Sequence, residues 1–183
     1  MTRVALLFAT GTEECEALNV ADILRRAGMD LSIISISKDT KVTGSHDITI
    51  IADELIEDHD FSKDDVLVIP GGMPGTKYMG EHELVKKAIK ELYDSNRFVC
   101  AICAAPTILG KGGYLEGKNA CVYPGNEDKL IGAKVNFDPV TRDGNVVTSR
   151  GLGTAISFAL EIISAVQGSE KAAEMAAKIV FNA

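Results

Sequence analysis

The sequence predicts an open α/β fold in which helices cover both faces of a mainly parallel sheet. Short runs rich in β-branched residues alternate with longer amphipathic segments, which is typical of repeated strand-helix units. The 183 residues are 46% hydrophobic, enough for one sizeable core. They contain no internal repeat, low-complexity tract or linker. We therefore expect residues 1–183 to form a single domain.

The first expected unit is a strand, a turn and a helix. The apolar run Arg3–Phe8 predicts the strand, and residues 10–12 supply a turn and a helix cap. From Glu14 onward, apolar residues recur at the 3.6-residue spacing of a helix until Gly28 stops it.

The rest of the chain continues this alternation. Further strands are expected at 30–35, 65–69, 97–102 and 119–122. Hairpins are expected around Gly44-Ser45 and Asp143-Gly144. Helices are expected at 83–93, from Pro106, at 154–166 with Thr154 as N-cap, and at 169–180 with Ser169 as N-cap.

Charge and cysteine content narrow the function classes. Nineteen Lys and Arg against 26 Asp and Glu give a net charge of -7, which lacks the basic field that nucleic acid requires. The apolar run near the N-terminus stops after Ala9, too early for a signal peptide or a membrane span. Four cysteines in a chain of this size do not indicate a disulfide framework. We expect a cytoplasmic protein with reduced thiols and neither nucleic-acid nor membrane partners.

The segment around Cys103 has the features of a reactive-cysteine bend. A β-branched strand ends at Cys103, and small residues follow it before Pro106 opens a helix. The bend resembles the nucleophile elbow of hydrolases, and it places the thiol at the carboxyl edge of the sheet, where ligands bind. A helix N-terminus lowers the pKa of a nearby thiol. The alternative is that Cys103 is a small buried hydrophobic residue, as most free cysteines are.

A second candidate, Glu16, follows the first strand at the same edge of the sheet. Glu13 and Glu14 fit an ordinary solvated role at a helix start. Glu16 lies on a different helical face, next to the buried stripe, where it would be desolvated and keep its proton near neutral pH if it points toward Cys103. A third element, Pro70-Gly71-Gly72, lets backbone N–H groups approach a ligand closely.

Other kinds of site are not indicated. Cys100 and Cys103 form a C-x-x-C, but Cys100 lies inside a strand rather than at a helix start, which argues against a redox dithiol. His46, His59 and His82 are scattered without ligand spacing, so we predict surface histidines and no metal. No nucleotide-binding glycine motif is present, and we predict no cofactor.

Taken together, the motifs resemble those of the ThiJ/PfpI superfamily. The resemblance is carried by Glu16, by Pro70-Gly71-Gly72, by the segment 101–106 around Cys103, and by the segment 148–154. It extends in order and spacing over almost the whole chain, and is strongest to the deglycase branch named for a parkinsonism-associated protein and to its bacterial relatives. It implies a flavodoxin-like three-layer sandwich, similar to class I glutamine amidotransferase domains, that forms a homodimer using the helix of Arg25 and Arg26.

The resemblance also implies roles for individual residues. Cys103 takes the nucleophile position and Glu16 that of the protonated carboxyl beside it. Gly72 and Ala104 take the positions whose N–H groups form an oxyanion-hole-like pocket. Arg150, Gly151 and Gly153 fall in a loop next to the site.

One residue departs from the pattern of the superfamily. Many relatives carry a histidine where this chain has Tyr123. Tyrosine titrates near pH 10, so it does not replace a base at neutral pH, and a protease or amidotransferase mechanism is disfavoured. His46 stands where the mammalian relative has an arginine.

Three functional hypotheses remain at this point. The first is a cofactor-independent glyoxalase or deglycase that acts on methylglyoxal-type aldehydes or on glycated proteins, with Cys103 as nucleophile and Glu16 as general acid and base. The second is a non-enzymatic oxidative-stress sensor or chaperone that works through a Cys103 sulfinate. The third is a dimeric binding domain whose cysteine pocket has no present role. An older family label, thiamine thiazole-phosphate biosynthesis, names no demonstrated chemistry.

Overall fold

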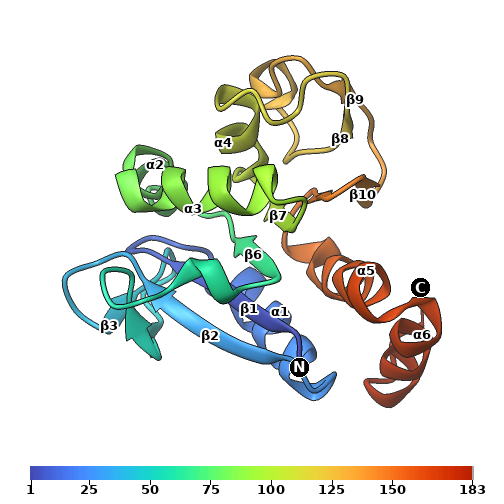
Figure 1. The fold of residues 1–183 in the computed structure, drawn as a ribbon, viewed down its shortest axis with the longest axis horizontal. Coiled ribbons are helices and arrows are strands. Elements are labelled where there is room, and N and C mark those ends of the chain that lie inside the picture. Colours follow the sequence, from blue (N-terminus) through green and yellow to red (C-terminus); the bar gives the residue numbers. More distant parts are fainter. Residues whose placement is uncertain (183) are drawn as a thin grey trace.

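A mainly parallel sheet forms the centre of the molecule, which a computed structural model describes for residues 1–182 (Figure 1). The seven strands lie in the order β10-β11-β7-β6-β1-β2-β5. Their bounds are β1 Arg3–Phe8, β2 Asp30–Ser35, β5 Glu54–Leu55, β6 Val66–Ile69, β7 Phe98–Ile102, β10 Val140–Asp143 and β11 Val146–Ser149. All neighbouring pairs are parallel except β10 and β11, which form the expected hairpin around Asp143-Gly144.

Helices cover both faces of this sheet, as predicted. One face packs against α1 (Glu14–Arg26), α5 (Ala155–Gln167) and α6 (Ser169–Lys178). The other packs against α2 (Gly75–Glu81), α3 (Glu83–Asp94) and α4 (Pro106–Lys111). Successive side chains of β1 point to opposite faces of the sheet. Val4 and Leu6 therefore lie in the first core, and Ala5 and Leu7 lie in the second. The predicted α/β sandwich is therefore confirmed.

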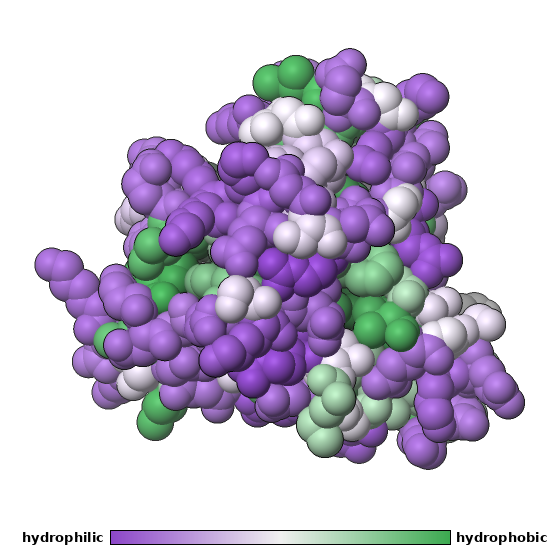
Figure 2. Space-filling model, viewed as in Figure 1, coloured by the Kyte–Doolittle hydropathy of each residue, from purple (hydrophilic) through white to green (hydrophobic). Residues whose placement is uncertain are grey.

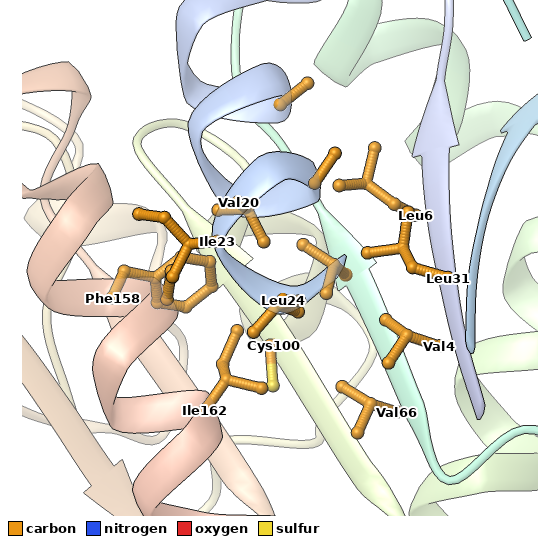
Figure 3. Packing of buried hydrophobic residues seen from close by; sticks show 14 of the residues in the cluster. Val4, Leu6, Val20, Ile23, Leu24, Leu31, Val66, Cys100, Phe158 and Ile162 are labelled. Carbon is orange, nitrogen blue, oxygen red and sulfur yellow. The ribbon is translucent and has the colours of Figure 1, made fainter. Parts of the chain in front are cut away.

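The packing of α1 shows why its apolar stripe is needed (Figure 3). Val20, Ile23 and Leu24 lie between the strand residues and the helix α5, which contributes Phe158 and Ile162. Cys100 sits in the same core and is fully buried, as its position inside β7 predicts. Each large side chain buried here stabilises the fold by about 2 kcal/mol.

Short elements complete the molecule away from the main sheet. A hairpin joins β3 (Lys41–Thr43) to β4 (Thr49–Ile51), and β8 (Asn119–Ala120) pairs with β9 (Lys134–Val135). Three single 3-10 turns occur at Phe61–Lys63, Glu127–Lys129 and Leu152–Thr154. Figure 1 shows β8, β9 and α4 grouped together beyond the end of the sheet, with α5 beside α1 and α6 beside α5.

Of the three predicted helix caps, Thr154 is the N-cap of α5 as predicted, whereas the other two differ from the sequence-based expectations. The α1 cap is Glu13 rather than residues 10–12, because the Thr12 hydroxyl instead accepts the Ala9 N–H (2.9 Å). The α6 cap is Gly168, whose φ of 97° makes the turn after α5, so Ser169 is the first helical residue.

Burial of His59 contradicts the prediction of three surface histidines. Its side chain is only 2% exposed, because it lies between the carboxylates of Glu54 and Asp64. These partners come from other elements, so no local pattern announced them. His46, in contrast, is exposed as predicted.

The visible face in Figure 2 is largely hydrophilic, with small separate apolar areas. Within residues 1–182, we find no helix with both the length and the apolar character needed to cross a membrane.

Candidate active site

Four connections leave the carboxyl ends of neighbouring strands and meet at one edge of the sheet. The chain after β1 carries Glu16, the chain after β6 carries Gly71 and Gly72, and the chain after β7 carries Cys103. The chain after β11 begins with Arg150. In an open α/β sheet this edge is where ligands bind.

Cys103 occupies a sharp bend between β7 and α4. Its φ is +63°, a left-handed conformation that is uncommon for any residue other than glycine. The backbone on both sides is fixed, since the Cys103 N–H donates to the Ser149 carbonyl (2.9 Å) and the Cys103 carbonyl accepts the Tyr123 N–H (2.9 Å). The predicted elbow geometry is present, with the thiol half-buried.

Glu16 lies in the first turn of α1 and points toward this thiol. Its side chain is hydrogen-bonded to Cys103 and also accepts from the backbone of Gly71 (2.9 Å) and of Leu152. Glu16 is only 1% exposed. The first turn of α1 is held in place by Glu13, whose carboxylate accepts the Glu16 N–H. The structure therefore brings together the two side chains that the sequence singled out.

Two glycines make this approach possible. A Cβ on Gly71 would lie 2.5 Å from the Cys103 Cβ and 2.8 Å from Glu16 Oε2, so any side chain there would separate the pair. Gly72 has a φ of +89°, and a Cβ on it would lie 2.2 Å from the backbone nitrogen of Glu13. Both positions therefore exclude a Cβ, Gly71 beside the Cys103 and Glu16 side chains and Gly72 against the loop before α1.

The Cys103 and Glu16 side chains perturb each other's protonation. Burial raises the pKa of Glu16 to about 7, although hydrogen bonds from Cys103 and Gly71 oppose the change. Burial and the neighbouring Glu16 charge raise the pKa of Cys103 to about 12, although the N–H groups of Ala104 and Gly72 oppose this. Because the two groups are in contact, they titrate as a pair.

The direction of the Cys103 shift is opposite to the one expected from its place at a helix start. The helix α4 has only six residues, and its first N–H groups do not outweigh the burial of the sulfur and the adjacent carboxylate. The thiol therefore keeps its proton while Glu16 is ionised. Glu16, with a pKa near neutrality, is the group in this pair that can accept a proton.

The backbone N–H groups of Gly72 and Ala104 lie close enough to the Cys103 sulfur to lower its pKa. We expected these two groups to form a pocket for a substrate oxyanion. In the structure they lie beside the nucleophilic atom, so an oxygen bonded to that sulfur, or to a carbon attached to it, would lie near the same donors.

Of the remaining residues predicted for the site, two border it and one holds the neighbouring loops together. Tyr123 is 51% exposed, and a Cβ on Gly151 would lie 3.3 Å from its ring and 4.0 Å from Glu16 Oε1. Arg150 instead points away from the thiol, with its guanidinium near the carbonyls of Val122 and Phe137 and over the Phe137 ring. Arg150 therefore ties neighbouring loops together, whereas Tyr123 and Gly151 border the site.

A large groove of about 1370 Å³ opens above the pair. Cys103 and Glu16 contribute to its lining, as do Gly72, Ala104 and Tyr123. Part of its wall carries lysines, namely Lys77, Lys86, Lys111 and Lys129. The groove is large enough for a small carbonyl compound or for a modified side chain of another protein.

Comparison with known proteins agrees with this geometry. The family model described as DJ-1/PfpI matches residues 2–165. The chain belongs to the DJ-1/PfpI family. The Drosophila melanogaster protein named dj-1beta is 38% identical over 179 residues, which cover 96% of each chain. The solved structure of oxidized Toxoplasma gondii DJ-1 superposes with a TM-score of 0.96 at 30% identity, covering 100% of both chains.

Another DJ-1 relative carries an activity in its name. The glutathione-independent glyoxalase DJR-1.2 of Caenorhabditis elegans is 32% identical over 168 residues, which cover 91% of this chain and 89% of that protein. The resemblance inferred from sequence motifs is thus confirmed at the level of the DJ-1/PfpI family.

One residue at the start of α1 has a role that sequence reasoning missed. Glu14 was interpreted as a solvated carboxylate, but it is 1% exposed and accepts the N–H groups of His46 (2.8 Å) and Ile48 (3.2 Å). The only sequence signal was its position one turn before the buried stripe of α1. Its partners lie 32 and 34 residues away, beyond the reach of any local motif.

Proposed function

We propose that this protein is a glutathione-independent glyoxalase or deglycase. Its substrates are 2-oxoaldehydes of the methylglyoxal type, or the adducts that they form with thiols and amines, including those on glycated proteins. The observation that carries the proposal is the hydrogen-bonded Cys103 and Glu16 pair at an open groove. The named activity of the Caenorhabditis elegans relative supports the same reaction class.

In the first step, the Cys103 sulfur adds to the aldehyde carbon. Glu16, ionised and hydrogen-bonded to the thiol, accepts its proton as the carbon–sulfur bond forms. The carbonyl oxygen gains negative charge next to the N–H groups of Gly72 and Ala104. Transfer of the proton from Glu16 to that oxygen gives a neutral hemithioacetal and returns Glu16 to its ionised form.

In the second step, Glu16 moves a proton between adjacent carbons. It removes the proton from the carbon bonded to sulfur, which gives an enediolate with its negative charge on the oxygen of the neighbouring carbon. The hydroxyl proton of the first carbon passes to that oxygen, and the neutral carboxyl delivers its own proton to the neighbouring carbon. The product is a thioester of a 2-hydroxy acid on Cys103. A carboxyl group with a pKa of about 7 suits both halves of this transfer near neutral pH.

In the third step, water cleaves the thioester. The hydroxyl adds to the acyl carbon, the carbon–sulfur bond breaks, and the sulfur recovers a proton. The sum is one 2-oxoaldehyde plus one water giving one 2-hydroxy acid, with no external oxidant or reductant. These side chains carry the proposed chemistry without a metal or an organic cofactor.

The test is formation of lactate from methylglyoxal by the purified chain. Cys103→Ser is expected to abolish turnover, because the hydroxyl is a far weaker nucleophile than the thiol. Cys15→Ser, which changes a cysteine on the exposed side of α1, is the matched control and is expected to leave turnover unchanged. Undiminished turnover in Cys103→Ser would exclude this scheme.

Dependence on pH adds a second readout. Because the ionised form of Glu16 acts as the base, kcat/KM is expected to rise with pH through about 7 and then to level off. A profile that falls over this range would contradict the role of Glu16 as base.

A second function, oxidation sensing, is favoured by the donors around the sulfur. Peroxide converts a thiol to a sulfenic and then a sulfinic acid, releasing one water at each step. The sulfinate oxygens would accept hydrogen bonds from neutral Glu16 and from the N–H groups near Cys103. Cys15 is exposed but lies outside this group of donors, which makes it an internal comparison.

Mass spectrometry after mild peroxide treatment tests this second function. Selective gain of two oxygens on Cys103, with Cys15 and the buried Cys100 and Cys121 unchanged, is expected. Equal oxidation of Cys15 and Cys103 would argue against a sensor.

A further inference from the structure

A second group of side chains that could bind a ligand lies at the rim of the groove. Glu13, Glu14 and His46 each place one donor atom within 4.8 Å of the others. The distance from His46 Nδ1 is 3.3 Å to Glu14 Oε2 and 3.8 Å to Glu13 Oε1. Donor atoms that share a metal ion at bond lengths of about 2.1 Å lie roughly 3 to 3.6 Å from one another. The observed spacing is therefore close to that of a coordination site.

The two carboxylates are oriented by the backbone. Glu14 Oε1 accepts the N–H groups of His46 (2.8 Å) and Ile48 (3.2 Å), and Glu13 Oε2 accepts the N–H of Glu16 (2.5 Å). Each of these two oxygens is therefore held by backbone N–H groups. The other oxygens, Glu14 Oε2 and Glu13 Oε1, face the His46 ring nitrogen, and the Ser45 hydroxyl lies within hydrogen-bond distance of Glu14 Oε2 (3.4 Å) and of His46 Nδ1 (3.1 Å). Hydrogen bonds of this kind orient metal ligands in known sites.

The hairpin of β3 and β4 leaves room for the Glu14 carboxylate at one point. A Cβ on Gly44 would lie 2.3 Å from the carboxyl carbon and from Oε1 of Glu14. Only glycine lets the hairpin close over this carboxylate. The position of Glu14 is thus fixed by the loop that also supplies His46.

The charges of this cluster are not balanced. Within residues 1–182, His46 is the single group that forms an ion pair with Glu13 or Glu14, and its side chain is 70% exposed. Glu13 and Glu14 are 12% and 1% exposed. Two neighbouring carboxylates and one imidazole therefore offer three donor atoms to a divalent cation at one place.

We propose that Glu13, Glu14 and His46 bind one divalent transition-metal ion at the rim of the groove. One imidazole nitrogen and two carboxylate oxygens suit Zn²⁺ or Co²⁺. Glu13 and His46 both line the groove, so the remaining coordination positions face the space that Cys103 also borders. This binding site is separate from the proton transfer proposed for Glu16 and Cys103, and it can be tested without measuring turnover.

The test is a metal titration of the chelator-treated full chain. Cys15→Ser and Cys103→Ser are introduced first, because these are the two cysteines that are not buried and thiolates bind Zn²⁺ strongly. Calorimetry with Zn²⁺ is expected to show one ion per chain. The visible spectrum with Co²⁺ is expected to lack thiolate-to-metal bands.

Single changes in the cluster distinguish a built site from unspecific binding. His46→Ala and Glu13→Gln are each expected to weaken Zn²⁺ binding at least tenfold, whereas Glu81→Gln, which changes another groove carboxylate, is expected to leave it unchanged. His46→Arg keeps a positive charge but offers no ligand, and it is expected to behave like His46→Ala. Absence of binding in the parent protein, or unchanged binding in His46→Ala, overturns the proposal.

Discussion

Buried carboxylates at the two ends of the central sheet have different kinds of neighbours. At the end where β6 and β7 begin, the Asp64 carboxylate is 2% exposed and lies 2.6 Å from His59 Nε2. Arg3 Nε is 3.8 Å from the same carboxylate, and Arg97 donates to the Asp64 carbonyl. At the end where these strands finish, Glu16 is 1% exposed and its polar contacts are backbone N–H groups and the Cys103 thiol.

The difference separates a structural cluster from a reactive one. Burial alone would lower the pKa of His59, but its hydrogen bonds to Asp64 and Glu54 outweigh burial and raise the pKa, which favours the protonated ring as a counter-ion. Glu16 has no such counter-ion among the residues described, and its pKa rises to about 7. A buried acid without a cation is ready to exchange a proton, whereas a paired acid is not.

The largest expected effect is the loss of turnover in Glu16→Gln. Removal of the base is expected to lower kcat/KM for methylglyoxal by about 100-fold or more. The same change removes a negative charge beside the sulfur, so the pKa of Cys103 is expected to fall. Rates of alkylation by iodoacetamide against pH measure that shift. A slower enzyme whose thiol ionises at lower pH is the expected combination, and a thiol that becomes harder to ionise would contradict it.

Substitution of Asp64, at the end of the sheet where β6 and β7 begin, is expected to cause a large loss of stability. Asp64→Asn leaves the protonated His59 ring buried without its main partner, and we expect a loss of about 3 kcal/mol in the free energy of unfolding at pH 6. Urea denaturation measures the loss, and titration of the His59 ring by NMR is expected to show a lowered pKa. Asp58→Asn, which changes an exposed carboxylate in the same loop, is the control.

Glu16→Gln is expected to change stability in the opposite direction. Folding raises the pKa of Glu16 from 4.5 to about 7, so the ionised carboxylate costs stability that is absent below pH 4.5 and complete above about pH 7. The neutral amide avoids this cost, and we expect a gain on the order of 2 kcal/mol at pH 8 and almost none at pH 4. Urea denaturation at the two pH values checks this, and an equal effect at both would show that the charge of Glu16 is not the cause.

The smallest expected effect concerns Tyr123. Its side chain is 51% exposed, and its hydroxyl has no hydrogen-bond partner within residues 1–182. Tyr123→Phe is therefore expected to change kcat/KM by less than about twofold, because the ring still borders the groove. A loss near that of Glu16→Gln would instead assign the hydroxyl a role in catalysis.

Most of the fold could be predicted because long apolar runs and helical spacing determine it locally. The strands β1, β2, β6 and β7 begin and end within a residue or two of their predicted bounds. Among the described helices and strands, β5, β9 and α2 were not predicted, and all three lack a local pattern. The strands β5 and β9 have only two residues each, and α2 begins and nearly ends with glycine, so neighbouring elements rather than propensity hold them in place.

The site was predictable where the topology of a parallel sheet determines it. Cys103 and Glu16 follow strands that end at the same edge, so their meeting could be expected from their places in the chain. The burial of Glu14 and His59 could not, since their partners come from distant segments. The direction of the Cys103 pKa shift depends on how closely Glu16 approaches, which sequence alone does not provide.

The left-handed backbone at Cys103 has a consequence for engineering. A residue with a side chain at φ +63° costs on the order of 1 kcal/mol relative to glycine. Glycine at this point would relax the bend while deleting the sulfur. A library of variants that is screened only for heat resistance should therefore accumulate inactive variants at position 103. A thermostabilised form of the protein has to be selected for activity as well as for melting temperature.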